Sequence, residues 1–240
     1  MEIYPGIKII GLALLVEKSR TLIIADIHIG FEESMNKQGI LIPRFQVMDT
    51  IESLKSIFIK TDRVKKTVIT GDFKHEFGSI SMQEWEDSMK IIDLILENSD
   101  ELIIVKGNHD IFLGPIAKKR GISIIDYLYL SNEKIYICHG NKMPNDNDFK
   151  RAKTIIIGHQ HPAISLREGS RTERYKCFLK GKLGNKNVIV MPSFLHISEG
   201  IDILKENIIS PFIKDINEFS AYVVGDKTYN FGKTKRLLNK

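Results

Sequence analysis

Apolar and polar positions alternate along this chain with two different periods. Runs such as TLIIA (21–25), TVIT (67–70) and TIII (154–157) are short and rich in β-branched residues, as is typical of buried strands. Two longer segments, residues 44–60 and 79–99, place apolar residues three or four positions apart, which predicts amphipathic helices. This mixture of strands and helices predicts an α/β fold in which helices pack on sheets.

The first apolar run, Ile7–Val16, is about half the roughly 20 residues that a membrane span requires, so we interpret it as one buried strand. From Ser123 onward strands dominate, and the final basic residues 233–240 are expected to form a frayed tail. We expect residues 1–240 to form a single domain, because no repeat or linker interrupts them. One stripe of the second predicted helix is expected to face the core: Trp85, Met89, Ile92 and Leu96. We therefore assign Trp85 no function.

Composition adds an expectation about compartment and partners. Two cysteines, Cys138 and Cys177, imply no disulfide framework, and the absence of a signal peptide favours a cytoplasmic protein without a membrane span. The net charge of +5 favours anionic partners. Basic residues concentrate between residues 167 and 186, which predicts either a loop that touches a polyanion or an ordinary solvated surface.

Five apolar runs end in polar side chains of the same few types. Six of the seven histidines lie just beyond these runs. The side chains, in chain order, are Asp26 and His28; Asp72 and His75; Asn108, His109 and Asp110; His139; and His159 and His161.

In open α/β sheets, functional groups collect outside the carboxyl ends of the strands, so these five ends could converge on one pocket. Carboxylates, an amide oxygen and neutral imidazoles bind divalent metals, and their number exceeds what a single ion would use. Two ions that share a bridging carboxylate would explain the surplus. Asp72 suits the bridge because Gly71 allows a close backbone approach and each carboxylate oxygen could hold one ion.

In this order, the motifs D-x-H, G-D, G-N-H-D, H-G and G-H-x-H resemble those of the calcineurin-like metallophosphoesterase superfamily. The stretch GDFKHEF is similar to the G-D-x-x-H-E of SbcD-type nucleases. The layout of nearly the whole chain resembles the small SbcD-related phosphoesterases, including the DNA-ligase-associated phosphodiesterase group. The resemblance implies a calcineurin-like two-sheet β-sandwich flanked by helices (αββα).

The resemblance also implies a role for each motif residue. One metal ion would be held by Asp26, His28 and His161, and the other by Asn108, His139 and His159. Asp72 would lie between the two ions. His109 would face the substrate phosphate, with Asp110 orienting its ring. His75 departs from the acidic residue of many relatives and would either assist the leaving group or support the pocket.

These assignments predict a dinuclear-metal phosphoesterase, specifically a phosphodiesterase that attacks phosphorus with a metal-bound hydroxide. Two divalent ions are expected, with Mn²⁺ favoured and Fe²⁺, Zn²⁺ or Ni²⁺ as alternatives. A single-stranded DNA or RNA nuclease, a phosphomonoesterase and a non-catalytic interaction scaffold stay open as alternatives.

Several other residues have less specific signals. Cys138 alternates away from His139 and is expected in the core. His196 is assigned a structural role, with pocket lining as the alternative. Residues 145–148, NDND, are interpreted as a polar turn. Tyr175 and Phe178 could stack on bases or belong to the core.

Overall fold

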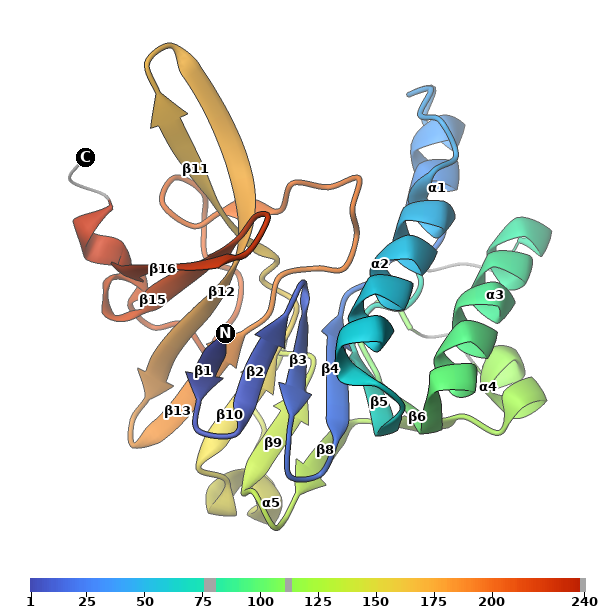
Figure 1. The fold of residues 1–240 in the computed structure, drawn as a ribbon, viewed down its shortest axis with the longest axis horizontal. Helices are drawn as coiled ribbons and strands as arrows, with labels where there is room; N and C mark the ends of the chain where they lie inside the picture. The colour runs from blue at the N-terminus through green and yellow to red at the C-terminus, as the bar shows by residue number, and fades with distance from the viewer. Residues whose placement is uncertain (76–80, 111–113, 238–240) are drawn as a thin grey trace.

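Two β-sheets form the centre of the computed structural model, which describes residues 1–75, 81–110 and 114–237 (Figure 1). The first sheet has seven strands in chain order. Its first four strands pair antiparallel, and β4 to β7 pair parallel. The strands are β1 (Glu2–Tyr4), β2 (Ile7–Ile10), β3 (Ala13–Val16), β4 (Thr21–Ala25), β5 (Val64–Thr70), β6 (Ser99–Val105) and β7 (Ser123–Ile125).

The second sheet has nine strands, with the order β14-β11-β12-β13-β10-β9-β8; in addition, β15 pairs with β12, and β16 pairs with β15. Strands β9, β10 and β13 run parallel. The strands are β8 (Tyr127–Leu130), β9 (Ile135–Cys138), β10 (Thr154–Ile157), β11 (Pro162–Glu168), β12 (Arg171–Leu183), β13 (Lys186–Val190), β14 (Ile201–Asp202), β15 (Ser220–Val224) and β16 (Thr228–Lys233).

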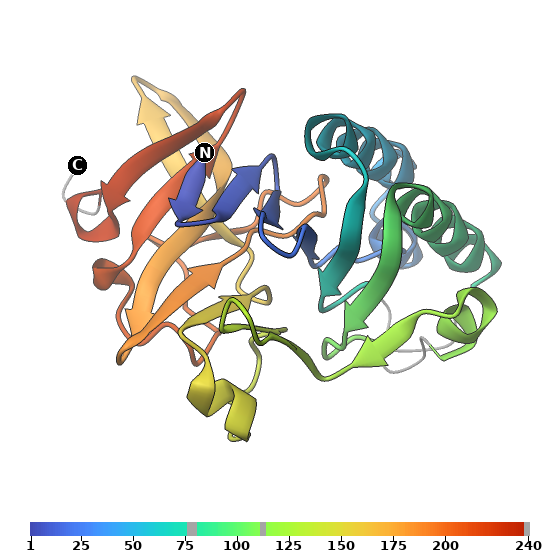
Figure 2. The same ribbon diagram turned by 60° about the horizontal axis from the view of Figure 1, so that its bottom comes forward.

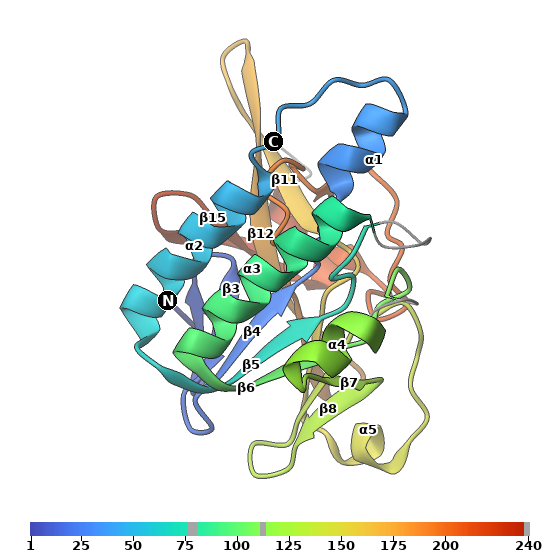
Figure 3. The ribbon, with the colours of Figure 1, turned by 90° about the vertical axis from the view of Figure 1, so that its right-hand side faces the viewer.

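Helices cover the outer faces of both sheets. Helices α2, α3 and α4 lie across the first sheet (Figure 3), and short elements cover the second (Figure 2). The predicted sandwich flanked by helices is therefore confirmed. The helices are α1 (Phe31–Lys37), α2 (Gln46–Thr61), α3 (Met82–Asn98), α4 (Gly114–Arg120), α5 (Asn147–Arg151) and the 3-10 helices η1 (Ile216–Glu218) and η2 (Thr234–Arg236).

Strand alternation divides the core into three layers. On β5, Val68 points between the sheets whereas Ile69 points toward the helices. On β9, Ile137 faces the first sheet and Cys138 faces the outer layer, as predicted for that cysteine. Strands with two apolar faces are buried on both sides, which explains why their sequences are continuous apolar runs.

The two predicted long helices are confirmed, with shifted ends. Helix α2 spans Gln46–Thr61, and α3 starts after Ser81, whose hydroxyl accepts the Glu84 amide at 3.0 Å in a capping box. Residues 79 and 80 of the second prediction lie outside the described residues. Met89 and Ile92 are buried and Trp85 and Leu96 pack beside them, so the stripe belongs to the core.

Two local predictions are wrong. The run Ile7–Val16 forms the hairpin β2–β3 instead of one strand, because Gly11, at φ +59°, turns the chain. The frayed tail was predicted from residue 233, but Thr234 is fully buried and Leu237 packs against the outer core. Residues 238–240 lie outside the described residues. None of the described helices has the length and apolarity needed to cross a membrane.

Candidate metal centre

The predicted site residues follow the carboxyl ends of five strands and lie at one edge of the sandwich. Strands β4, β5 and β6 of the first sheet precede Asp26, Asp72 and Asn108. Strands β9 and β10 of the second sheet precede His139 and His159. The predicted ligands therefore meet between the two sheets, as the strand-end argument expected.

The first group of donors consists of Asp26, His28 and His161. His161 Nε2 lies 3.4 Å from Asp26 Oδ2 and 3.4 Å from His28 Nε2. Ligands of one ion, each about 2.0–2.2 Å from it, lie roughly 3 Å apart, so these three atoms have the spacing of a shared site. Asp26 is fully buried, and the structure groups the three residues around a space that could hold a metal ion.

The second group consists of Asn108, His139 and His159. His139 Nε2 lies 2.9 Å from Asn108 Oδ1 and 3.1 Å from His159 Nδ1. These spacings again match ligands of one ion. An oxygen and two imidazole nitrogens form a donor set for a borderline divalent cation.

Asp72 lies between the two groups. Its Oδ2 is 3.4 Å from His139 Nε2 and 3.9 Å from His28 Nε2. Its Oδ1 instead accepts the backbone amide of His109 at 2.9 Å. Oδ2 is therefore the Asp72 oxygen nearest to both groups, and the expectation that each carboxylate oxygen would hold one ion stays a prediction.

Backbone strain is concentrated at these positions. Five of the eight non-glycine residues with positive φ in the described chain are predicted ligands, and such values are uncommon outside glycine: Asp26, His28, Asp72, His159 and His161. Neighbouring contacts hold this conformation. Gln46 Nε2 donates to the carbonyls of Ile27 and His28 at 3.1 and 2.7 Å, and Gln160 Oε1 accepts the amides of Ile209 and Ser210.

Glycines let the strand ends approach one another. A β-carbon on Gly71, at φ +84°, would lie 1.8 Å from His139 Nδ1. A β-carbon on Gly107 would lie 2.2 Å from Asp72 Oδ1, and one on Gly158 would lie 2.4 Å from Asp26 Oδ2. The close approach predicted for Gly71 is confirmed, and Gly107 and Gly158 have the same role in their motifs.

Burial controls ionisation in the cluster. Burial lowers the pKa of His159 to about 4, helped by nearby His139, and it lowers the pKa of His28 as well. Burial would raise the pKa of Asp26, but His161 and His139 hold it below its usual range. These shifts favour neutral imidazoles at His28 and His159, the form that binds divalent metals. Burial would lower the pKa of His139 as well, but the neighbouring carboxylates of Asp26 and Asp72 raise it.

Burial also raises the pKa of Asp72, so its negative charge is costly in this position. A bound cation would relieve that cost. The donor types and spacings fit a pair of divalent ions held through the two groups and Asp72.

The predicted catalytic residues lie beside this centre. His109 Nε2 is 3.9 Å from Asp72 Oδ2, and its Nδ1 is 2.5 Å from the backbone carbonyl oxygen of His75. His75 Nδ1 lies 3.4 Å from His28 Nδ1, and its ring packs against Phe31. The structure therefore places both histidines at the mouth of the cluster.

Asp110 has different partners from those predicted. Its carboxylate accepts three backbone amides, from Phe73 at 2.9 Å, Lys74 at 3.2 Å and Gly107 at 3.0 Å. Asp110 was expected to orient the His109 ring, but the backbone carbonyl of His75 contacts that ring instead. Burial raises the pKa of Asp110 to about 6. Through its three hydrogen bonds, Asp110 holds the loop after β5, with Phe73 and Lys74, against the loop after β6, with Gly107.

The basic 167–186 region is a hairpin of β11 and β12 that projects from the sandwich, rather than a loop (Figure 1). Several of its cations have partners inside the protein. Lys176 Nζ donates to the carbonyls of Ser193 and Leu195, and Lys180 Nζ lies 4.1 Å from the centre of the Tyr4 ring. Arg174 pairs with Glu206 at 3.0 Å.

The structure also places the residues that had less specific sequence signals. Phe178 is fully buried and Tyr175 packs partly buried against the outer core, so both fit the core interpretation. The NDND run is more ordered than a turn, because Asp146 caps α5 by accepting the Phe149 amide at 2.8 Å. The ring of His196 contacts Phe194, and its Nε2 is buried.

Sequence reasoning missed the residues that hold the ligand loops in place. Lys176 fixes Ser193 and Leu195, and the intervening Phe194 amide donates to the carbonyl of Ala25 at 2.7 Å. Gln46 supports the His28 turn from α2. Both residues are far in sequence from the motifs they support, so no local pattern identifies them.

The sequence model of the calcineurin-like phosphoesterase family matches residues 19–225, and the chain belongs to this family. The protein is therefore a metal-dependent phosphoester hydrolase, as the motifs predicted. The closer resemblance to SbcD-related enzymes stays a prediction. No curated protein matches this chain.

Three solved structures are similar to this one. Nuclease MPE from Pseudomonas putida has 21% identity over 91% of each chain and a TM-score of 0.62. A protein of unknown function from Aquifex aeolicus has 18% identity over 59% of this chain and 78% of that one, with a TM-score of 0.40. A predicted phosphoesterase from Streptococcus pneumoniae has 15% identity, 89% and 97% coverage, and a TM-score of 0.36. The first of these likenesses supports the fold.

Proposed function

We propose that this protein hydrolyses phosphodiesters at a centre of two divalent metal ions. One observation carries the proposal: a single oxygen, Asp72 Oδ2, lies 3.4 Å from His139 Nε2 in one donor group and 3.9 Å from His28 Nε2 in the other. Asp26, His28 and His161 would hold one ion, and Asn108, His139 and His159 the other. Bound together, such ions lower the pKa of water and neutralise charge on the phosphoryl oxygens.

His109 is the best candidate for assisting the leaving group. Because the His75 carbonyl can only accept, it fixes a proton on His109 Nδ1 and leaves Nε2 facing the centre. In the imidazolium form, Nε2 donates a proton or hydrogen bond to the departing oxygen. Asp110 is a positioning residue that holds the Phe73 and Gly107 backbones on either side of the centre.

The preference for a diester over a monoester rests on the resemblance of the motifs to the SbcD-related phosphodiesterases, because the donor set alone fits both kinds of ester. Ligand type leaves the metal open, and we favour Mn²⁺ on the resemblance to nucleases.

The experiment that tests this proposal compares two chromogenic substrates with the same leaving group. Mn²⁺-loaded protein is assayed on bis(4-nitrophenyl) phosphate and on 4-nitrophenyl phosphate, beside Asp72→Asn prepared identically. We expect diester hydrolysis with the higher kcat/KM, together with loss of both bound metal and rate in Asp72→Asn. A preference for the monoester, or full activity and metal content in Asp72→Asn, would contradict the assignment.

A nuclease that acts on single-stranded DNA or RNA is the second candidate function. The Pseudomonas putida structure that shares this fold over 91% of each chain is that of a nuclease, and the net charge of +5 would attract a polyanion. Cleavage of end-labelled single-stranded DNA and RNA tests this candidate. Nuclease activity should fall steeply with rising salt, because phosphate contacts release counterions.

A further inference from the structure

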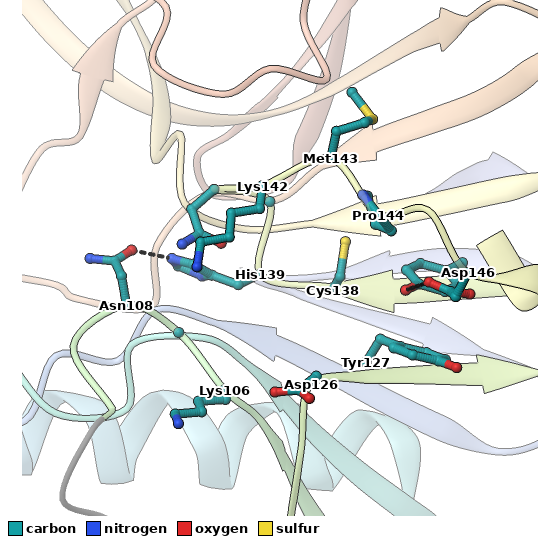
Figure 4. A pocket seen from close by; sticks show the side chains of 14 residues that line it. Lys106, Asn108, Asp126, Tyr127, Cys138, His139, Lys142, Met143, Pro144 and Asp146 are labelled. Carbon is teal, nitrogen blue, oxygen red and sulfur yellow. Dashed lines mark hydrogen bonds between the residues drawn. The ribbon is translucent and has the colours of Figure 1, made fainter.

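A cavity of about 570 Å³ opens beside the second donor group and shares Asn108 and His139 with it (Figure 4). Its volume lies in the range of small-molecule sites, which is about 300–1,000 Å³. The cavity is formed by the ends of β6 and β9, the start of β8, and the loop that follows His139. A molecule whose phosphate lies at the metal centre can therefore reach this cavity.

The metal end of the cavity is cationic. Lys106 and Lys142 lie on either side of the Asn108–His139 pair (Figure 4). Both lysines are exposed, and neither ammonium group makes a hydrogen bond or ion pair with any residue that the structure describes. Two free cations beside a phosphoester site are suited to phosphate oxygens.

The middle of the cavity is apolar and partly rigid. Met143 and Pro144 lie on one side, and Tyr127 lies on the other (Figure 4). The Tyr127 ring is held against the Tyr136 ring, with centroids 4.7 Å apart and planes at 20°. A fixed aromatic wall opposite a flexible methionine suits a flat, weakly polar group.

An acceptor lies next to this apolar section. Asp126 is exposed at the wall of the cavity, and its carboxylate has no hydrogen-bond or ion-pair partner among the described residues. Asp146, by contrast, already accepts from the Tyr136 hydroxyl at 2.7 Å and from the Phe149 amide at 2.8 Å. Asp126 is therefore available to accept a hydrogen bond from an amino group on a ligand.

We propose that this cavity is a nucleotide subsite, in which Lys106 and Lys142 bind phosphate, Tyr127, Met143 and Pro144 enclose the base, and Asp126 accepts from the exocyclic amino group of the base. The proposal rests on the phosphodiesterase function and specifies its substrate class. A carboxylate accepts from the amino group of cytosine, whereas uracil has a carbonyl oxygen at that position. The subsite should therefore prefer a base that carries an amino group.

Competitive inhibition of bis(4-nitrophenyl) phosphate hydrolysis tests the proposal without specifying which side of the phosphate the nucleoside occupies. The inhibitors are cytidine 5′- and 3′-monophosphates, the matching uridine nucleotides, and ribose 5-phosphate, which lacks a base. For the better cytidine isomer we expect inhibition at least about tenfold stronger than by ribose 5-phosphate, equivalent to about 1.4 kcal/mol. Uridine nucleotides should be weaker inhibitors than their cytidine counterparts.

Variants locate the effect in the cavity. Met143→Ala should reduce the advantage of cytidine nucleotides over ribose 5-phosphate several-fold, and Asp126→Asn should abolish the preference for cytidine over uridine. Lys142→Ala should weaken all phosphate inhibitors alike. The controls are Lys55→Ala and Met82→Ala, which change exposed residues on α2 and α3 and should keep the wild-type ratios.

The outcomes separate the two proposals. Equal inhibition by ribose 5-phosphate and all nucleotides, with diester hydrolysis intact, would overturn the nucleotide subsite alone. A cytidine advantage that survives both Met143→Ala and Asp126→Asn would place the base elsewhere and overturn it equally. Absence of metal-dependent diester hydrolysis would overturn the proposed function, and the subsite would fall with it.

Discussion

The Gly71→Ala variant tests whether close backbone approach builds the metal centre. Gly71 has φ +84°, and a β-carbon there would lie 1.8 Å from His139 Nδ1. Carbon and nitrogen atoms in contact normally lie about 3.5 Å apart, so the imidazole would have to move by roughly 1.5 Å or more. His139 is 2% exposed and has little space in which to move.

Two costs follow from this substitution. An alanine in the left-handed region costs about 1–2 kcal/mol of folding free energy. Displacing His139 also breaks the 2.9 Å spacing to Asn108 Oδ1 and the 3.4 Å spacing to Asp72 Oδ2. Changes that disturb the support of a metal ligand lower metal affinity by about 10–100-fold, and we expect at least this loss.

A matched control separates the two costs. Gly184→Ala has a similarly positive φ of +60°, but its β-carbon would have no neighbour within 4 Å. It should lose about 1–2 kcal/mol of stability and keep its metal affinity. Calorimetric titration with Mn²⁺ and urea unfolding in EDTA measure the two quantities. Wild-type Mn²⁺ affinity in Gly71→Ala, at full stoichiometry, would refute the reasoning.

Three further predictions concern catalysis, pH and metal. His109→Ala should keep bound metal but lower kcat on bis(4-nitrophenyl) phosphate by about 10²–10⁴-fold, and unchanged turnover would remove His109 from the mechanism. Burial lowers the pKa of Lys176 to about 7, below the 10.5 of the unfolded chain. Between these values the unfolded chain binds more protons, so stability should rise with pH by up to about 1.4 kcal/mol per unit. Lys176→Met should lack this rise when unfolding free energies are compared in EDTA at pH 7.5 and 9.5, and equal slopes would contradict it. Mn²⁺ at 100 times its dissociation constant should stabilise the wild-type protein by about 2.7 kcal/mol over the EDTA-treated form in urea unfolding, with no such gain for Asp72→Asn.

The sequence alone identified the strands and the residues at their ends. Buried strands need apolar side chains on both faces, so runs such as TLIIA and TIII identify themselves locally. Metal-binding side chains belong to few residue types, and their repetition after successive strands predicted which residues would meet. Short elements such as α1 and α4, and the turn at Gly11, were missed because seven residues or one glycine give a weak periodic signal.

The tertiary structure alone decided which atoms meet. Asp26 Oδ2 accepts the amide of His159, which is 133 residues away, and this contact exists only because the two sheets pack with their strand ends together. The same packing brings Asp72 Oδ1 to the His109 amide and the Asp110 carboxylate to the Phe73 amide. It also places Lys176 Nζ in the interior, where it donates to the Ser193 carbonyl. A local pattern specifies residue types and periods, whereas these contacts depend on distances between segments far apart in the chain.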